Sequence, residues 1–182
     1  MRYLNIVGEI NELGLESILE KISEFREEEL EFIQTMLESE EFTREDAVAL
    51  LGPVAVNIST FGGIIDTGFA ILDALSTLES PIYTRANGYC MSTGLLLLLA
   101  GDHRECGPYT TFMYHTIAYG CEGPLARHKA QVLASKDVQK RFDSIITEKT
   151  SITDRQLKKY VNGEWYLNPE QALNLGLAHT IR

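Results

Sequence analysis

The sequence predicts an α/β fold in which strands and helices alternate and the strands pair in parallel. Its 182 residues are enough to bury one sizeable core. Hydrophobic residues make up 45% and charged residues 23%, ordinary values for a globular protein. Short stretches rich in β-formers are each followed by apolar residues at helical spacing, which is the pattern of parallel pairing. No repeat, low-complexity tract or linker interrupts it, so we expect one domain over residues 1–182.

The expected elements follow one another along the whole chain. Strands are expected at residues 3–10, 54–58, 81–86, 105–106, 110–115 and 178–181, and helices at 13–37, 47–51, 64–78, 95–100, 124–150, 153–161 and 168–175. The helical phase slips near Glu27, so residues 13–37 fit either one long helix or two consecutive helices. Thr43 and Asp46 resemble a capping box. Residues 87–94 are expected to form a tight connection.

The net charge of −10 is concentrated in one segment. Between Glu16 and Asp46 there are twelve acidic and three basic residues, a local net charge of −9. This surface is unsuited to nucleic acid, because phosphate contacts need Lys and Arg. It is either a solvated helix face or a docking surface. No apolar stretch approaches the roughly 20 residues that span a bilayer, so we expect no membrane partner.

The cysteines indicate a reducing compartment. Cys90, Cys106 and Cys121 form no CxxC motif and cannot all pair with one another. The N-terminal residues lack the long apolar region of a secretory signal. We therefore predict a cytoplasmic protein, and nothing in the sequence calls for a metal or a cofactor.

Two strand-to-helix junctions carry the candidate chemistry. Gly62 and Gly63 follow an apolar strand, where paired glycines allow the backbone to approach a ligand closely. Ser92 lies at the start of an apolar helix, beside free backbone N–H groups. That position suits a nucleophile whose attack creates an oxyanion. Spacing alone equally fits a serine that only caps the helix.

The junction segments resemble motifs of the Clp protease proteolytic subunit, ClpP. Residues 88–94 (GYCMSTG) resemble its nucleophile segment G-x-A-A-S-M-G. Residues 59–63 (STFGG) resemble its N-S-P-G-G loop, and residues 111–115 (TFMYH) resemble the strand that carries its catalytic histidine.

Two further segments continue the resemblance in the same order. Gly120 and Gly123 stand where the ClpP family has glycines before a long handle helix. Residues 166–177 (YLNPEQALNLGL) resemble its closing F-L-S-A-P-E-A-V-E-Y-G-L. The likeness covers roughly Val54 to the C-terminus and the first strand. It implies the ββα spiral fold that ClpP shares with crotonases.

The resemblance assigns roles to individual residues. It implies that Ser92 is the nucleophile of a serine endopeptidase and that His115 is its general base and acid. It places the oxyanion hole at the backbone N–H groups of Gly62 and Thr93, with Gly63 supporting the bound substrate strand. The implied substrate is an unfolded or small polypeptide.

The third triad member is the main departure from the family. The family has an aspartate where this chain has Glu164, which is one methylene longer. Triads with glutamate exist on other folds, so Glu164 is our candidate for the acid. Asp154 is the nearest alternative, although its position favours a helix cap. A catalytically weak or inactive site remains a competing hypothesis.

Other departures concern the cleft and the partners. Phe61 replaces the family's proline, and Cys90 stands two residues before Ser92. Compared with the family, we expect the N-terminal gate segment to be missing or nearly so, and we expect an acidic helical extension at residues 14–50. These differences put docking of a Clp-type ATPase in doubt. Viral ClpP-like peptidases also differ from the family in these regions, so the chain resembles them in this respect.

The resemblance also implies an assembly. ClpP subunits form stacked heptameric rings, and the helix at 124–150 would supply the ring-to-ring handle in a homo-oligomer. The same apolar pattern also fits an ordinary amphipathic core helix.

Other function classes stay open at this point. They are a crotonase-type acyl-CoA enzyme, a serine–lysine dyad peptidase using Lys136 or Lys140, and a non-catalytic ring subunit.

Overall fold

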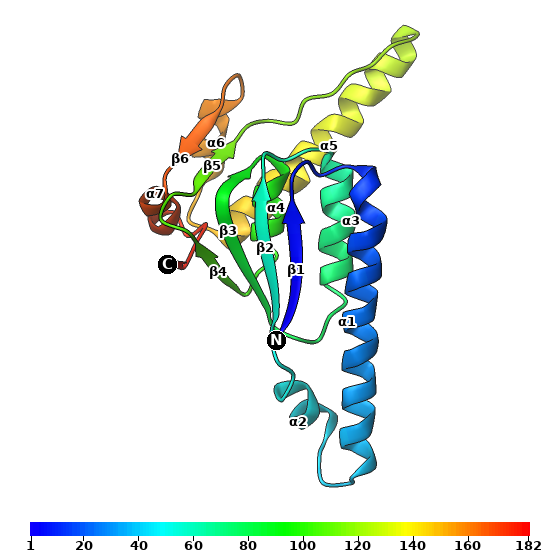
Figure 1. The fold of residues 1–182 in the computed structure, drawn as a ribbon. Coiled ribbons are helices and arrows are strands. Elements are labelled where there is room, and N and C mark those ends of the chain that lie inside the picture. Colours follow the sequence, from blue (N-terminus) through cyan, green and yellow to red (C-terminus); the bar gives the residue numbers. More distant parts are fainter.

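The computed structural model describes residues 1–182 and has a parallel sheet at its centre (Figure 1). Five strands pair in parallel in the order β1-β2-β3-β4-β7, with bounds β1 Arg2–Val7, β2 Val54–Thr60, β3 Ile82–Met91, β4 His103–Cys106 and β7 Thr180–Ile181. Strand β5 (Thr111–Tyr114) pairs in parallel with the end of β3. Strand β6 (Trp165–Leu167) adds the one antiparallel pairing, to β5. The predicted α/β class and parallel pairing are confirmed.

Helices cover one face of this sheet (Figure 1). Along β2, Val54, Val56 and Ile58 are fully buried, whereas Ala55 and Asn57 between them are partly exposed. This period of two is the mark of a sheet with one covered face. The covering helices are α1 (Glu12–Glu38), α3 (Ile65–Leu75) and α4 (Thr93–Leu98). The remaining elements are α2 (Arg44–Ala49), α5 (Leu125–Lys149), α6 (Asp154–Leu157), the 3₁₀-helix η1 (Lys158–Tyr160) and α7 (Pro169–Asn174).

Residues 12–38 form one uninterrupted helix. Asn11 caps it, its side-chain oxygen accepting from the backbone N–H groups of Leu13 at 3.1 Å and Gly14 at 3.3 Å. The helix continues beyond the end of the sheet, and α2 lies beside this far part (Figure 1). The capping box predicted at α2 is present, with Thr43 and Asp46 bonding each other's backbone N–H groups.

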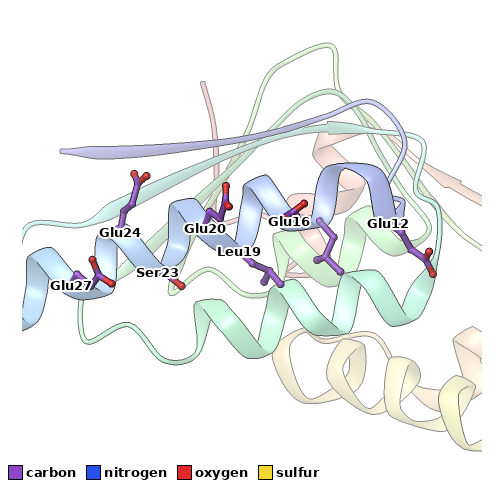
Figure 2. Close-up of a pocket in the computed structure, with 8 residues that line it drawn as sticks. Glu12, Glu16, Leu19, Glu20, Ser23, Glu24 and Glu27 are labelled. Carbon is purple, nitrogen blue, oxygen red and sulfur yellow. The ribbon is translucent and has the colours of Figure 1, made fainter.

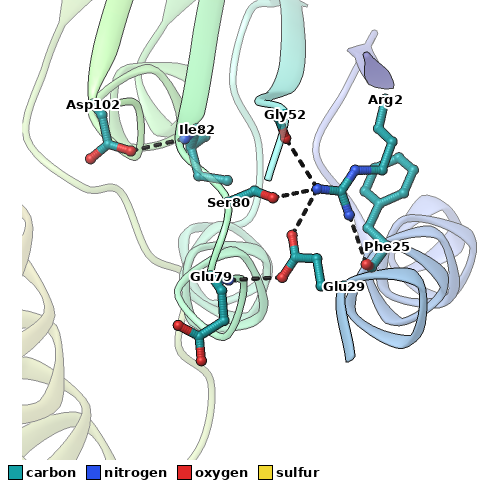
Figure 3. Close-up of polar contacts among 8 residues, drawn as sticks. All are labelled: Arg2, Phe25, Glu29, Gly52, Glu79, Ser80, Ile82 and Asp102. Atoms are coloured by element: carbon teal, nitrogen blue, oxygen red, sulfur yellow. Dashed lines mark hydrogen bonds and ion pairs between the residues drawn. The ribbon is translucent and has the colours of Figure 1, made fainter. Parts of the chain in front are cut away.

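A buried ion pair attaches α1 to the start of the sheet (Figure 3). Arg2 donates to Glu29 Oε1 at 2.9 Å, to the Phe25 carbonyl at 2.8 Å and to Ser80 Oγ. Glu29 is only 1% exposed, and its second oxygen accepts from the backbone N–H of Glu79 at 2.8 Å. The pair therefore joins β1, α1 and the turn before β3.

The prediction of a tight connection at residues 87–94 is wrong for most of that segment. Strand β3 continues through it to Met91, and Gly88 takes a positive φ of 70°. The first part of β3 pairs with β4 and the last part, from Tyr89, with β5. Asn87 and Gly88 have the composition of a turn, but here they mark the bend at which the strand changes partners.

Helix α5 has two distinct halves. Phe142 and Ile146 in its second half are buried in the core. Its first half projects away from the sheet (Figure 1), leaving Leu125 70% and Leu133 64% exposed. The helix thus contributes to the core at one end and leaves large apolar side chains exposed at the other. None of the helices combines the length and the apolar character that crossing a membrane requires.

Candidate functional site

Ser92 lies between the end of β3 and the start of α4 with an unusual backbone. Its φ is 51° and its ψ is −120°, and Glu40 is the one other non-glycine residue with positive φ. Such a conformation costs on the order of 1–3 kcal/mol and persists where the surrounding structure enforces it. The Ser92 N–H donates to the Met113 carbonyl at 2.7 Å, which ties this turn to β5.

The side chain of Ser92 does not cap α4. Ser92 occupies the N-cap position, yet its hydroxyl accepts from no backbone N–H group of the helix. A capping serine normally has an extended backbone, with its oxygen directed at the first turn. The strained backbone instead leaves the Oγ without a structural hydrogen bond, which removes the capping interpretation.

Gly62 lies directly against this serine. A Cβ added at Gly62 would be 2.7 Å from Ser92 Cβ and 2.9 Å from the Met91 carbonyl oxygen. Gly62 also has a φ of 101°, in the left-handed region that favours glycine. Both the space and the backbone therefore require glycine at this position.

Gly63 is held from two sides. Its carbonyl accepts from Thr93 Oγ1 at 2.9 Å, next to Ser92. On the other side it forms a bridge to Ile10, whose carbonyl oxygen would be 2.0 Å from a Cβ at Gly63. Gly63 thus lies between Ile10, which follows β1, and Thr93, which follows Ser92.

The backbone N–H groups around Ser92 differ in their hydrogen bonds. Those of Thr93 and Gly63 have no acceptor in the structure. The Gly62 N–H donates to Thr60 Oγ1 at 2.9 Å. Of the two amides that the resemblance assigns to an oxyanion hole, one is thus open and the other is occupied by a neighbouring hydroxyl.

Ser92 and His115 line the same pocket, whose volume is about 560 Å³. The loop residues Phe61 and Gly63 form part of its wall, and Thr93 lies beside Ser92. A further wall comes from one side of α5, namely Gln131, Ala134, Ser135, Val138 and Phe142. The structure thus brings together the predicted residues Ser92, His115, Thr93 and Gly63.

Several pocket residues were not among the sequence candidates. The carboxylates of Glu9 and Asp66 lie at the wall, as do Gln131 and Ser135 from α5. The α5 residues recur at intervals of three and four, so the helical period could have grouped them. Nothing in the sequence indicated that this face of α5 would turn toward Ser92.

His115 directly follows β5 and is half-buried. No hydrogen bond engages its side chain, and no Asp or Glu carboxylate oxygen lies within 4.0 Å of its ring nitrogens. The backbone N–H of Ile117, in contrast, donates to Gln139 Oε1 at 2.7 Å. The ring nitrogens are therefore uncommitted, and no hydrogen bond orients the ring.

Glu164 directly precedes β6, as His115 directly follows β5, but its side chain bonds elsewhere. Because Tyr114 pairs with Trp165, the antiparallel register continued by one residue faces His115 with Glu164. The Glu164 side chain is exposed, and its Oε2 accepts from the Tyr166 hydroxyl at 2.8 Å. This hydrogen bond raises the pKa of Tyr166. The alternative acid, Asp154, is the first residue of α6, after the N-cap Thr153.

The alternative nucleophile and base are poorly placed. Cys90 is completely buried, and burial raises the pKa of its thiol, so the reactive thiolate is disfavoured. Lys136 and Lys140 do not line the Ser92 pocket, and Lys140 belongs to a separate hollow with Phe69 and Asp73. The geometry favours neither a cysteine nor a serine–lysine site.

The acidic helix carries a separate hollow. Figure 2 shows glutamates ranged along α1, and the hollow is lined by Glu12, Leu15, Glu16, Leu19, Glu20, Ser23, Glu24 and Glu27. It shares no residue with the Ser92 pocket. These glutamates are exposed, unlike the buried Glu29 on the same helix.

Fold and site together define a class of protein: an α/β spiral with a strained serine and a histidine in one pocket. The Clp protease family model matches residues 20–182. The chain is 24% identical over 138 residues to ATP-dependent Clp protease proteolytic subunit 2 of Treponema denticola, covering 75% of this chain and 69% of that one. It is 28% identical over 131 residues to proteolytic subunit 1 of Salinibacter ruber, covering 71% and 56%.

A solved structure shows the same fold. It is a mutant of ClpP1 from Listeria monocytogenes, with a TM-score of 0.76 and 21% identity, covering 100% of this chain and 91% of that one. The chain belongs to the Clp protease family.

Proposed function

We propose that the chain is a serine endopeptidase that cleaves unfolded or small polypeptides inside an oligomeric chamber. One observation carries this proposal: Ser92 has a strained backbone and an uncommitted hydroxyl in a pocket that it shares with His115. The strain is hard to explain by stability, because a relaxed capping serine would cost less. A reactive hydroxyl directed into a substrate pocket explains it.

The proposed chemistry follows from these positions. Ser92 Oγ attacks the carbonyl carbon of the scissile peptide bond while His115 takes its proton. The protonated His115 then gives that proton to the leaving amine, and water hydrolyses the acyl-enzyme by the reverse sequence. Because no other group is hydrogen-bonded to the His115 ring, the ring is available both to take the proton from Ser92 and to give it to the leaving amine.

The developing oxyanion needs backbone donors. The unoccupied Thr93 N–H supports its role as one donor. For Gly62 to be the second, its N–H must exchange Thr60 Oγ1 for the substrate oxygen. Gly63, whose carbonyl is bound to Thr93 Oγ1, supports the loop along which the substrate strand would lie.

Glu164 is the proposed orienting acid. It directly precedes Trp165, which pairs with Tyr114 next to His115, so a change of side-chain conformation would direct the carboxylate toward the imidazole. That change breaks the hydrogen bond from Tyr166. The proposed triad is thus Ser92, His115 and Glu164, with the third member engaged only after this exchange.

The exposed arm of α5 supports an assembly. Leu125 and Leu133 are exposed on the first half of α5, on sides that the rest of the chain does not cover, as expected for a handle between stacked heptameric rings. By the names of its relatives, a Clp-type ATPase is a candidate partner. The acidic surface of α1 is the feature that would make docking of such an ATPase differ from docking on other family members. We also propose that the protein is cytoplasmic.

A second candidate function is a catalytically weak or inactive ring subunit. The observation that favours it is the lack of any carboxylate within 4.0 Å of His115. Without an orienting acid, activity in such triads falls by about 10⁴.

Peptide hydrolysis distinguishes the two candidates. We expect the oligomeric fraction, defined by native mass spectrometry, to hydrolyse fluorogenic peptides. Activity should be lost in Ser92→Ala and kept in Ser17→Ala, an exposed serine on α1. A ring without serine-dependent hydrolysis would establish the inactive subunit, and a monomer would exclude the chamber.

A further inference from the structure

Two side chains of α5, Gln139 and Asp143, bond residues on either side of His115. Gln139 Oε1 accepts from the backbone N–H of Ile117 at 2.7 Å. Gln139 Nε2 donates to the Tyr114 hydroxyl at 3.2 Å. One side chain therefore bonds residues on both sides of His115.

Asp143 completes the network. Its Oδ1 accepts from the Tyr114 hydroxyl at 2.7 Å and from Gln139 Nε2 at 2.8 Å. Gln139 and Asp143 are four residues apart, so they project from the same face of α5. Every polar atom of the Gln139 side chain is thus engaged, which fixes its amide in one orientation.

The environment makes these bonds strong restraints. Tyr114 is 3% exposed and stacks on Phe142 with ring centroids 5.8 Å apart. Burial and the Asp143 carboxylate raise the pKa of Tyr114, so its hydroxyl remains a donor. Phe142 also lines the Ser92 pocket. A polar group buried this deeply is costly to leave without its partner.

The residue after His115, Thr116, is also hydrogen-bonded to another part of the chain. Thr116 Oγ1 donates to the Val161 carbonyl at 3.0 Å, in the loop that precedes Glu164. The side chains of Tyr114 and Thr116 and the backbone N–H of Ile117 are therefore all bonded, whereas the ring of His115 has no hydrogen bond of its own. The position of the imidazole must come from its backbone.

We propose that Gln139 is a positioning residue for His115: its side chain holds Tyr114 and Ile117 against α5 and so sets the imidazole opposite Ser92. This inference rests on the proposed function, because it assumes that His115 is the general base. It also makes α5 part of the catalytic machinery, since a shift of the helix moves both anchors of the His115 segment.

The test is a double-mutant cycle on the intact oligomer. The measured quantity is the rate at which a fluorophosphonate probe labels Ser92 in wild type, Gln139→Leu, His115→Ala and the double variant. Gln34→Leu, an exposed glutamine of α1, is the matched control. We expect Gln139→Leu to slow labelling between about 10-fold and 100-fold, the effect of misplacing a reacting group by about 1 Å. In the His115→Ala background it should have no further effect.

Each other outcome is decisive. Equal slowing in both backgrounds would mean that Gln139 only stabilises the pocket, and an unchanged rate in Gln139→Leu would mean that it does nothing; either overturns the inference alone. Labelling that does not depend on His115 would overturn the proposed function together with the inference. If Gln139→Leu fails to fold, Tyr114→Phe takes its place in the cycle, with a smaller slowing that must again vanish without His115.

Discussion

The hydroxyl of Tyr166 donates to Glu164 Oε2 at 2.8 Å, which holds the proposed triad acid away from His115. If the carboxylate must leave Tyr166 to orient the imidazole, Tyr166→Phe removes a competitor and should raise the rate of peptide hydrolysis. Glu164→Gln should lower it at least 10-fold, since loss of the orienting acid can cost about 10⁴. Steady-state kcat measures both.

The matched comparison is Asp154→Asn. We expect it to keep wild-type kcat, because Asp154 belongs to the first turn of α6. Should Asp154→Asn lose activity while Glu164→Gln keeps it, the assignment of the acid is wrong. A slower Tyr166→Phe variant would mean that the tyrosine supports Glu164 and does not compete for it.

Gly62→Ala should abolish activity and destabilise the protein. The new Cβ would stand 2.7 Å from Ser92 Cβ, and the φ of 101° is strained for any other residue. The free energy of unfolding should fall by about 1–3 kcal/mol, the cost of a residue held in a sparsely populated backbone region. Denaturant unfolding and probe labelling of Ser92 measure the two effects.

Gly120→Ala is the control for this substitution. A Cβ at Gly120 meets nothing within 4 Å and its backbone is ordinary, so stability and labelling should stay at wild-type values. A Gly62→Ala variant that labels like wild type would show that the loop can withdraw from Ser92, contrary to the close packing of Gly62 on that serine.

Arg2→Ala should be strongly destabilising. It leaves the Glu29 carboxylate, 1% exposed, without its cation, and breaking a buried pair in this way costs about 3–5 kcal/mol. For a chain of this size we expect the melting temperature to fall by about 10 °C. Calorimetry of the variant measures it.

Arg44→Ala provides the comparison. Its ion pair with Glu79 has a similar length, 2.8 Å, but both side chains are largely exposed, and such pairs contribute little. The melting temperature should hardly change. Equal shifts in the two variants would contradict the role given to burial.

Cysteine alkylation should be confined to Cys121 in the folded protein. Cys90 and Cys106 are fully buried, and burial raises the pKa of both thiols, so neither presents a thiolate at neutral pH. Cys121 is partly exposed. Iodoacetamide followed by peptide mapping should find one site, and three sites after unfolding in urea. Alkylation of folded Cys90 would reopen the cysteine as a nucleophile.

The arrangement of strands and helices was largely predictable from the sequence. The period of two residues in the sequence matches the alternating burial of β2. The helical period of 3.6 residues matches α1, which is one continuous helix in spite of the phase slip near Glu27. The extension of β3 was missed because Asn87 and Gly88 have turn composition. Their real role depends on β5, a strand that arrives about twenty residues later.

The candidate site was grouped by its resemblance to the ClpP motifs, and its catalytic roles stay predictions. The structure does bring Ser92, His115 and Gly63 to one pocket, but the hydrogen bonds of this pocket were not predicted. Which partner a polar group selects is decided by distances of a few tenths of an ångström. The hydrogen bond of Glu164 with Tyr166 and that of Thr60 with the Gly62 amide are examples of such choices. The bonds of Gln139 to Tyr114 and Ile117, on either side of His115, are another.

The most direct test of the account is the site at which a fluorophosphonate probe reacts. We predict a single adduct on Ser92, mapped by mass spectrometry of the folded protein, lost in Ser92→Ala and strongly slowed in His115→Ala. Folded protein that acquires no adduct, or an adduct on Ser92 that forms equally fast without His115, would contradict the account.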